Sequence, residues 1–451
     1  MKVGLIAMSG VRVVNAELNR VGVTLPGFVE RSKVIASLPS LSLLTLAALT
    51  PPDIEVEYRE IAELRDPSSL PNDYDLVAIS SFTAQANESY RVADHYVARG
   101  VPVVMGGLHT TVMPDEARAH GATAAVGEGE LTWPTVLEDF RRGTLRDEYR
   151  PPPGQWFDLA DAPMPRFELL DLQRYNRLTV QTTRGCPWRC EFCASSILLT
   201  PKYRVKPVDK VLAEIRRIRG LWEHPFIEFA DDNSFVAKYH ARELLSALRG
   251  EGIKWFTETD VSVADDEALL DLMRESGCRQ VLVGLESPEA PGLDGVELRR
   301  NWKLDRLPDY EAAVRRIQAR GITVNGCFVL GLDGHTPDIF DRVYEFVARS
   351  GLYEVQLTVM TAFPGTPLYQ RLKQEGRLIE EGAWDKCTLF DVNHVPTGMT
   401  PEQLQQGLLD LACRVYDPAF VEERRKRFFR NLKSRRVVAR ALAEEESSHE
   451  A

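Results

Sequence analysis

Residues 182–193 are Thr182-Thr183-Arg184-Gly185-Cys186-Pro187-Trp188-Arg189-Cys190-Glu191-Phe192-Cys193, so three cysteines have the spacing C-x3-C-x2-C. Three thiolates on so short a loop can converge on one metal centre, and they leave one iron of a four-iron cubane without a protein ligand. A small molecule can coordinate and react at that open iron. Residues 177–183 have the pattern of a strand, so we expect the loop at a strand's carboxyl end, where α/β folds place their chemistry.

Two other roles are open to cysteines at this spacing. Zinc is the main chemical rival, but structural zinc sites use four protein ligands, usually in paired C-x2-C knuckles. Three buried structural cysteines are the simplest alternative, which such tight spacing disfavours. The other cysteines lie far apart in the sequence and are expected in the core, so we expect a single cluster; they are Cys278, Cys327, Cys387 and Cys413.

The composition is that of a globular enzyme. At 451 residues, with 44% hydrophobic and 27% charged residues, the chain is long enough for two or three domains. Its net charge of −11 argues against general binding of nucleic acid. No apolar run approaches the ~18 residues that span a membrane, and residues 1–7 begin a strand rather than a signal peptide. Seven cysteines, an odd number, suit a reducing cytosol, so we expect a cytoplasmic protein without a transmembrane segment.

The first 146 residues alternate between strand and helix patterns. Short β-branched runs separated by amphipathic stretches of 10–15 residues predict a parallel, doubly wound, Rossmann-like sheet. The expected strands cover residues 2–8, 54–60, 75–80, 101–105 and 123–126, and the expected helices cover 40–49, 84–98, 114–120 and 131–142.

Three loops follow strands of this predicted sheet at the edge where such sheets bind ligands. Glycines let a backbone approach a flat or phosphorylated ligand closely, and hydroxyls satisfy its polar edges. Taken alone, each loop is also compatible with an ordinary turn. The loops are Ser80-Ser81-Phe82-Thr83, Gly106-Gly107-Leu108-His109-Thr110 and Gly127-Glu128-Gly129-Glu130.

The rest of the chain divides into three parts. Residues 147–176 are a proline-rich, extended connector. Residues 177–375 contain six strand–helix units, which predict a partial (β/α)6 barrel of TIM type with an open side that admits a large substrate. Residues 376–451 are predicted to be a mainly helical extension that covers the substrate side and ends in a disordered tail over 444–451. Within it, His394 is either a substrate contact or a structural histidine.

The cysteine loop resembles that of the radical SAM enzymes, including Gly185 before its first cysteine and Phe192 before its third. The resemblance implies that Cys186, Cys190 and Cys193 hold a [4Fe–4S] cluster whose fourth iron binds S-adenosylmethionine (SAM). The Asp231-Asp232-Asn233-Ser234-Phe235 run resembles the family's D-D-x-F with one extra residue, and Gly284-Leu285-Glu286-Ser287 resembles its G-x-E-S. Helix capping is an equally good account of the two aspartates. The implied SAM contacts are Phe192, Asp231, Glu258, Glu286, Ser287, Asn325 and Gly331.

The first domain resembles the cobalamin-binding domain that precedes the barrel in one radical SAM subgroup, where G-G-x-H-x-T and G-E-G-E runs are typical. The histidine motif D-x-H-x-x-G is missing from the loop after the first strand, so the resemblance implies a cobalt without a histidine ligand. A vestigial domain that binds nothing is the alternative. The implied cobalamin contacts are Ser80, Ser81, Phe82, Thr83, Gly106, Gly107, His109, Gly127, Glu128 and Gly129.

The resemblance covers almost the whole chain, and the extension resembles that of hopanoid-methylating enzymes. It implies cleavage of SAM to a 5′-deoxyadenosyl radical and cobalamin-dependent methylation of an unactivated carbon. Radical cyclisation, ring contraction or C–C coupling, with cobalamin absent or in another role, is the alternative chemistry, and a non-catalytic iron–sulfur module is the alternative from another class. The expected partners are a small-molecule or lipid-like substrate and an electron donor such as flavodoxin or ferredoxin, without nucleic acid. The sequence identifies neither the substrate nor a catalytic side chain.

Overall fold

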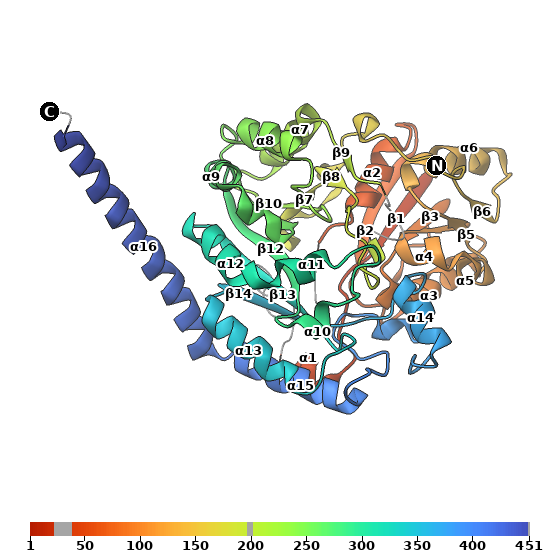
Figure 1. Cartoon of the computed structure of the whole chain (residues 1–451). Coiled ribbons are helices and arrows are strands. Elements are labelled where there is room, and N and C mark those ends of the chain that lie inside the picture. The colour runs from red at the N-terminus through yellow and green to blue at the C-terminus, as the bar shows by residue number, and fades with distance from the viewer. Residues whose placement is uncertain (22–37, 196–201, 450–451) are drawn as a thin grey trace.

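Two parallel sheets, each of six strands, organise the computed structural model, which describes residues 1–21, 38–195 and 202–449. Figure 1 shows the first sheet and its helices in red to orange on one side, and the second, in yellow through green to blue, beside it. Both sheets have helices packed on them, and the chain ends in a long helix. The predicted α/β class, with a Rossmann-like sheet followed by a barrel-like sheet, is confirmed.

The first sheet has the strand order β2-β1-β3-β4-β5-β6, and every pair is parallel. Its strands are β1 (Lys2–Met8), β2 (Glu55–Ile61), β3 (Leu76–Ser80), β4 (Val103–Gly106), β5 (Thr123–Ala125) and β6 (Glu148–Tyr149). The sequence predicts the first five, whereas β6 is too short to show a periodic pattern. The helices of this part are α1 (Ala16–Val21), α2 (Leu41–Leu49), α3 (Ala86–Val97), α4 (Leu108–Val112), α5 (Pro114–Ala119) and α6 (Gly129–Arg142).

Strand β1 shows why this sheet is central to its domain. Its residues from Val3 to Met8 are all buried, as expected for a strand whose two faces are both covered. Ile6 and Met8 pack in the apolar core on one face, with Ile79 and Met105. The opposite face has a second core, which includes Leu5 and Ala7 of β1 together with Leu43, Ala47, Val104 and Trp133.

The second sheet has the order β14-β13-β12-β11-β10-β7, and its two edge strands are not paired with each other. Its strands are β7 (Leu178–Val180), β10 (Phe226–Phe229), β11 (Lys254–Thr259), β12 (Cys278–Glu286), β13 (Thr323–Leu330) and β14 (Glu354–Val359). It is therefore a partial barrel with an open side. The helices between its strands are α7 (Val208–Leu221), α8 (Lys238–Leu248), α9 (Glu267–Glu275), α10 (Ala290–Leu293), α11 (Trp302–Arg306), α12 (Tyr310–Ala319) and α13 (Ile339–Ser350).

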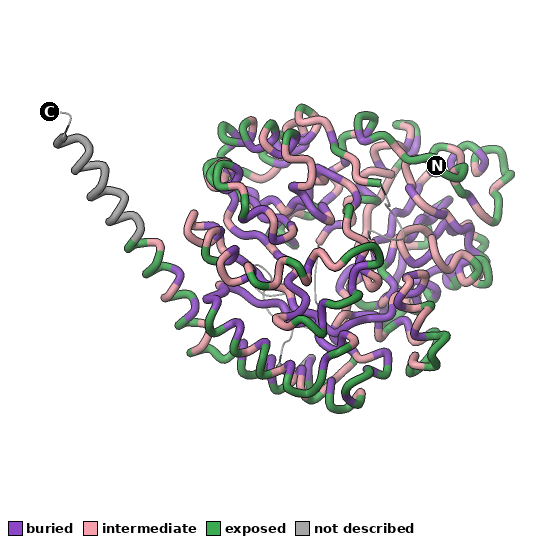
Figure 2. Tube along the Cα trace, in the orientation of Figure 1, coloured by how far each residue is buried: buried purple, intermediate pink, exposed green. Residues whose placement is uncertain are grey.

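Side chains alternate along the barrel strands between the helix layer and the barrel interior. Trp255 and Thr257 of β11 are buried under the helices, whereas Glu258 points the other way. Figure 2 shows the buried strands in purple inside a rim of exposed helix surface in green. Polar side chains inside the barrel are thus candidates for binding rather than for packing.

The extension is mainly helical, as predicted. It contains α15 (Pro401–Val415) and α16 (Pro418–His449) and follows α14 (Pro367–Gln374). The structure has α16 helical up to His449 where the sequence predicts a disordered tail from 444, because residues 444–446 are glutamates, which are good helix formers. Residues 450–451 of that predicted tail lie outside the described residues. Among the described helices, none combines the length and apolar character that a bilayer span requires.

Candidate functional site

The cysteine loop begins after a two-residue strand, β8 (Thr183–Arg184), which pairs antiparallel with β9 (Arg204–Val205). Asp231, which follows β10, accepts hydrogen bonds from the backbone N–H groups of Thr182 and Thr183 at 2.8 and 2.9 Å. Asp232 accepts from the N–H of Gly185 at 3.0 Å. The adjacent carboxylates therefore hold the backbone that leads into the loop. A role of Asp231 as a direct SAM contact remains a prediction.

The three cysteines share a poorly solvated space. The pKa of Cys186 is raised to about 12, mainly by burial and in part by the negative charge of a Cys193 thiolate. Burial raises the pKa of Cys190 as well, again with a contribution from Cys193. Three neighbouring thiolates are therefore stable only beside a cationic centre. This donor set fits an iron–sulfur cubane, which binds each thiolate through a separate iron.

No group of three or more His, Cys, Asp or Glu side chains in the described ranges is arranged to hold a single metal ion. The chemistry of the thiols matches the predicted cluster, and their assignment as its ligands remains a prediction.

A cavity of about 510 Å³ lies between the carboxyl edge of the first sheet and the mouth of the barrel. The barrel contributes Thr179, Gln181, Arg184, Ala230 and Asp232 to its lining. Eight of the ten predicted cobalamin contacts line the same cavity: Ser80, Ser81, Phe82, Gly106, Gly107, Gly127, Glu128 and Gly129. The cavity therefore connects the three glycine- and serine-rich loops with the strand ends that carry the cysteine loop.

The other two predicted contacts, Thr83 and His109, are outside this lining. His109 is 1% exposed, and its Nε2 lies 3.0 Å from the Tyr90 hydroxyl and 3.2 Å from Glu116 Oε2. Trp384 of the extension packs edge-on against the His109 ring and donates to Glu116 at 3.0 Å. His109 thus takes part in a contact between the first domain and the extension. None of the described residues that line the cavity is a histidine.

The backbone of the second loop faces the cavity at close range. Gly107 has φ +97°, and a Cβ at this position would lie 3.2 Å from the carbonyl oxygen of Ser81 and 3.4 Å from Ser80 Oγ. A side chain would force apart two loops that both line the cavity. This glycine cradle fits a large flat ligand such as cobalamin.

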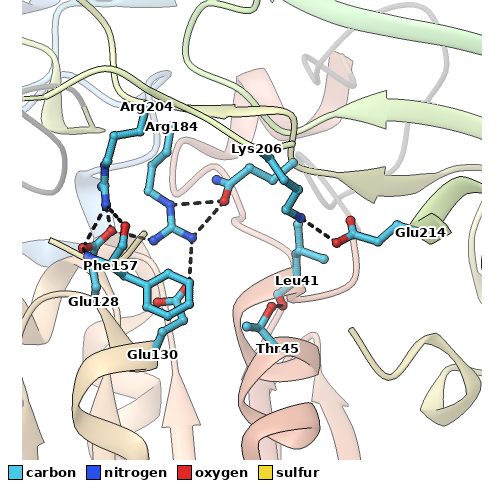
Figure 3. A network of polar contacts seen from close by, with 10 residues as sticks. Leu41, Thr45, Glu128, Glu130, Phe157, Arg184, Arg204, Lys206 and Glu214 are labelled. Carbon is cyan, nitrogen blue, oxygen red and sulfur yellow. Dashed lines mark hydrogen bonds and ion pairs between the residues drawn. The ribbon is translucent and has the colours of Figure 1, made fainter. Parts of the chain in front are cut away.

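An ionic network joins the third loop to the cysteine loop (Figure 3). Arg184, two residues before Cys186, donates to Glu128 at 2.6 Å and to Glu130 at 2.7 Å. Arg204, on the paired strand β9, also donates to Glu128, at 2.7 Å. Burial raises the pKa of Glu128, but its hydrogen bonds with Arg204, Phe157 and Arg184 outweigh burial and lower it. Neither arginine was identified from the sequence as a functional residue, although Arg184 lies only two residues before the cysteine motif.

Glu258 and Asn325 lie in one row across the barrel interior, because each pairs with Leu282 of the strand between them. The Glu258 side chain is accessible to water, but this water lies inside the barrel, where protein encloses it. The pKa of Glu258 is raised to about 8, mainly by burial and in part by the charges of Glu228, Asp232, Asp231 and Glu286. Asn325 is buried, and its Oδ1 has no hydrogen-bond partner among the described residues. Both side chains are therefore available to a ligand.

Glu286 ends β12 in an unusual conformation. Its φ of +60° is left-handed, and the β12–β13 register shifts beside it. The buried Lys303 donates to Glu286 Oε1 at 2.8 Å and to the carbonyl of Gly284 at 2.9 Å. Lys303 was not singled out from the sequence, because it lies 17 residues beyond its partner. It fixes the carboxylate at the strand end.

The remaining predicted residues occupy several environments. Ser287 is buried, and its hydroxyl lies 3.0 Å from His335 Nε2. Gly331 has φ +81°, and a Cβ there would lie 2.6 Å from Leu404 of α15. Phe192 packs against the apolar cluster that contains Cys190. His394 is fully buried, and burial lowers its pKa to about 4. The structure thus brings Glu258, Glu286 and Asn325 to the barrel interior, whereas Ser287 and Gly331 face neighbouring segments.

Three family models match the chain. Residues 68–137 match the B12 binding domain, residues 180–347 match the Radical SAM superfamily, and residues 366–448 match a domain of unknown function, DUF4070.

Several curated proteins are similar over most of the chain. The uncharacterized methyltransferase sll1242 of Synechocystis is 30% identical over 409 residues, which are 88% of this chain and 74% of that protein. The bacteriochlorophyllide d C-12(1)-methyltransferase of Chlorobaculum tepidum is 28% identical over 397 residues, 86% of this chain and 84% of that protein. The hopanoid C-2 methylase of Rhodopseudomonas palustris is 26% identical over 401 residues, 85% and 72% of the two chains.

Two solved structures share the fold. The radical SAM methyltransferase TsrM from Kitasatospora setae superimposes with a TM-score of 0.65 at 17% identity, covering 92% of this chain and 83% of TsrM. The cobalamin-dependent SAM radical enzyme OxsB superimposes with a TM-score of 0.68 at 15% identity, covering 92% and 66% of the two chains.

Proposed function

Since this chain belongs to the radical SAM superfamily and carries a B12-binding domain before its barrel, we propose that it methylates an unactivated carbon of a large, ring-bearing small molecule. The family predicted from the cysteine spacing is confirmed by these matches, and its cofactors are a [4Fe–4S] cluster, SAM and cobalamin. When bound, the cluster supplies the electron that cleaves SAM, and cobalamin supplies the methyl group.

One observation carries the proposal. The cavity of about 510 Å³ is lined both by the predicted cobalamin loops and by residues at the barrel mouth next to the cysteine loop. A methyl donor and a radical generator must act on the same carbon, so their sites have to be adjacent. The protein's own contribution is to hold these sites together and to exclude water between them.

Each part of the chain has a place in this proposal. We propose that residues 1–146 bind cobalamin, that residues 177–375 bind the cluster and SAM, and that the connector 147–176 and the extension 376–451 close the assembly. The contacts of the extension support its role, because Trp384 donates to Glu116 and Asp391 accepts from the N–H groups of Val14 and Asn15 at 2.9 and 2.7 Å. It therefore spans the barrel and the first domain.

The names of the relatives support the substrate class. Bacteriochlorophyllides and hopanoids are both large molecules with several rings. This chain aligns with more than two thirds of the two bacteriochlorophyllide d methyltransferases and of the hopanoid C-2 methylase. The unpaired edges of β7 and β14 leave the barrel open on one side, where such a molecule can enter. An open-iron cluster also requires a reducing compartment, so we propose a cytoplasmic location and a one-electron protein donor.

The test is anaerobic reconstitution with iron, sulfide, hydroxocobalamin, SAM and a reductant. We expect 5′-deoxyadenosine and S-adenosylhomocysteine to form together with a product heavier by one methylene, carrying deuterium when the SAM methyl group is deuterated. Cys186→Ser should abolish the cluster, 5′-deoxyadenosine and the methylated product. Cys413→Ser changes an exposed cysteine and is the control, which should retain all three. A product without the added carbon would favour the radical cyclisation or coupling alternative, and the absence of 5′-deoxyadenosine would contradict the proposal.

A further inference from the structure

A short exposed segment pairs directly with the cysteine loop on the outside of the barrel. We call residues 296–301 the strap. Cys190 and Glu297 form an antiparallel bridge. The N–H of Glu191 donates to the carbonyl of Val296, and the N–H of Leu298 donates to that of Arg189, both at 2.9 Å. The strap therefore lies directly against the cysteine loop, and its residues 298–300 are exposed to solvent.

The exposed face of the strap has an apolar centre surrounded by arginines. Leu298 is 45% exposed, and Arg299 and Arg300 are exposed beside it. Arg189, half-buried in the cysteine loop, is adjacent through the backbone pairing. Within the described parts of the chain, none of these three arginines forms an ion pair. Arginine and exposed apolar side chains are typical of protein interfaces.

Two stacked tryptophans support this surface from below. Trp188 of the cysteine loop and Trp302 of α11 stack with ring centroids 4.3 Å apart. The Arg300 guanidinium lies over Trp188, 5.6 Å from the ring centroid, and Asp260 fixes Trp188 by accepting from Nε1 at 2.8 Å. The strap is thus a supported surface whose shape is tied to the cysteine loop.

The charge of this surface contrasts with that of the whole protein. The chain has a net charge of −11, so its average electrostatic interaction with an acidic protein is repulsive. The strap and Arg189 carry three arginines. The nearby carboxylates are those of Glu297, which is buried, and of Asp294, two residues before the strap, which accepts from Asn301 at 2.6 Å. A local positive patch in a negative field steers an acidic partner to one face.

From this placement we propose that the strap and Arg189 form the docking surface for a small acidic protein that delivers one electron to the cluster. The inference rests on the proposed function, because it requires a cluster on the cysteine loop. One electron passes from the reduced flavin of the donor to the cluster, so the donor is oxidised and the cluster is reduced, and no bond is made or broken. The path from the surface to Cys190 runs through the paired backbones of the strap and the loop.

The experiment uses the reconstituted holoenzyme and measures how fast its cluster is reduced. Flavodoxin in its reduced form is the protein donor. The small-molecule donor is the uncharged deazaflavin radical, which forms when deazaflavin is illuminated with a sacrificial electron donor such as Tricine. The variant combines Arg299→Glu and Arg300→Glu, whose side chains touch no predicted cofactor ligand. Lys254→Glu is the matched control, because Lys254 is exposed at the start of β11, at the opposite end of the barrel strands from the cysteine loop.

At low ionic strength we expect the double variant to be reduced by flavodoxin about tenfold more slowly than the wild type. Reduction by deazaflavin should be unchanged, and Lys254→Glu should behave as the wild type with both donors. Added salt should slow the wild type toward the variant. A wild-type flavodoxin rate in the double variant would overturn the proposal, and so would an equal loss with deazaflavin, which would show damage to the cluster itself.

The readout separates this proposal from the proposed function. Cluster reduction is followed by electron paramagnetic resonance without a substrate, so it succeeds even if no methylated product forms. Binding of oxidised flavodoxin, measured by calorimetry at two salt concentrations, is a second readout that needs no turnover. We expect the double variant to bind several-fold more weakly at low salt, and equal binding would contradict the docking surface.

Discussion

Arg184, two residues before the first cysteine of the loop, donates a hydrogen bond to Glu128 of the first domain at 2.6 Å. The side chains of this pair are only 18% and 7% exposed. Both residues line the cavity between the two sheets. The position of the cysteine loop is therefore tied to the loop that is predicted to hold cobalamin.

Removal of the shared carboxylate tests this link. Glu128→Ala leaves Arg184 and Arg204 with one acceptor fewer in a largely buried site, and we expect a loss of about 2–3 kcal/mol in the free energy of unfolding. Because the pKa of Glu128 is lowered in the folded protein, this contribution is present above pH 4.5, its ordinary value, and is lost as the pH falls through the folded pKa. Urea unfolding at pH 7 and at a series of pH values below 4.5 measures both effects.

Glu138→Ala is the control for this prediction, since Glu138 lies in α6, the helix that begins directly after Glu128, and pairs with Arg142 at 2.5 Å in an exposed position. It should cost no more than about 0.5 kcal/mol. Equal losses of unfolding free energy in the two variants would show that the link between the loops stabilises the protein no more than an exposed ion pair does.

The sequence predicts the elements of this site better than their contacts. The cysteine spacing and the glycine-rich loops are local patterns, so the family and the fold class follow from them and are confirmed. The pairing of Arg184 with Glu128 joins residues 56 positions apart, and no periodicity encodes it.

Long-range contacts also explain why some predicted site residues have surroundings other than those predicted. His109 follows a strand like the other loop residues, but a neighbouring tyrosine and glutamate bind its ring outside the cavity. Asp231 satisfies backbone N–H groups that the tight turn before the cysteines leaves without partners. Most of these hydrogen-bond partners are distant in the sequence, and all of them come together only in the folded chain.

Gly107 provides a test of the glycine cradle. Gly107→Ala adds a Cβ at φ +97°, 3.2 Å from the carbonyl of Ser81, so we expect a destabilisation of about 1–2 kcal/mol and a marked loss of corrinoid affinity. Gly100→Ala is the matched control, because Gly100 also has a left-handed φ of +74° but nothing lies within 4 Å of the added Cβ. Gly100→Ala should lower the free energy of unfolding but leave the corrinoid affinity unchanged. Absorbance titration with hydroxocobalamin distinguishes them, and equal affinities would contradict a ligand site at Gly107.

The buried pair at the end of β12 predicts a separation of stability from binding. Lys303→Met leaves the Glu286 carboxylate without its cation, and we expect a loss of about 3–5 kcal/mol. Adding Glu286→Gln should restore most of the stability, because the charge is then removed from the buried site. SAM affinity, measured by equilibrium dialysis of the reconstituted protein, should remain low in the double variant. Recovery of SAM binding along with stability would show that Glu286 does not contact SAM.

Glu258 predicts a pH dependence of stability in the protein before reconstitution. Its pKa rises from 4.5 to about 8 through burial, so between these values the folded protein binds more protons than the unfolded chain. Stability therefore falls as the pH rises through this window. Glu258→Gln imitates the protonated carboxyl, so we expect its free energy of unfolding to equal that of the wild type at pH 5. At pH 9 it should be higher than that of the wild type by about 1–2 kcal/mol. This value is smaller than the pKa shift alone gives, because water reaches the barrel interior.

Urea unfolding of both proteins across this pH range makes the measurement. Glu243→Gln, at an exposed glutamate of α8, is the control and should follow the wild type at every pH. If Glu258→Gln also follows the wild type, the Glu258 carboxyl is ionised and well solvated inside the barrel. A ligand group that meets it there would then encounter a full negative charge at neutral pH, instead of the hydrogen-bond donor that a pKa of about 8 provides.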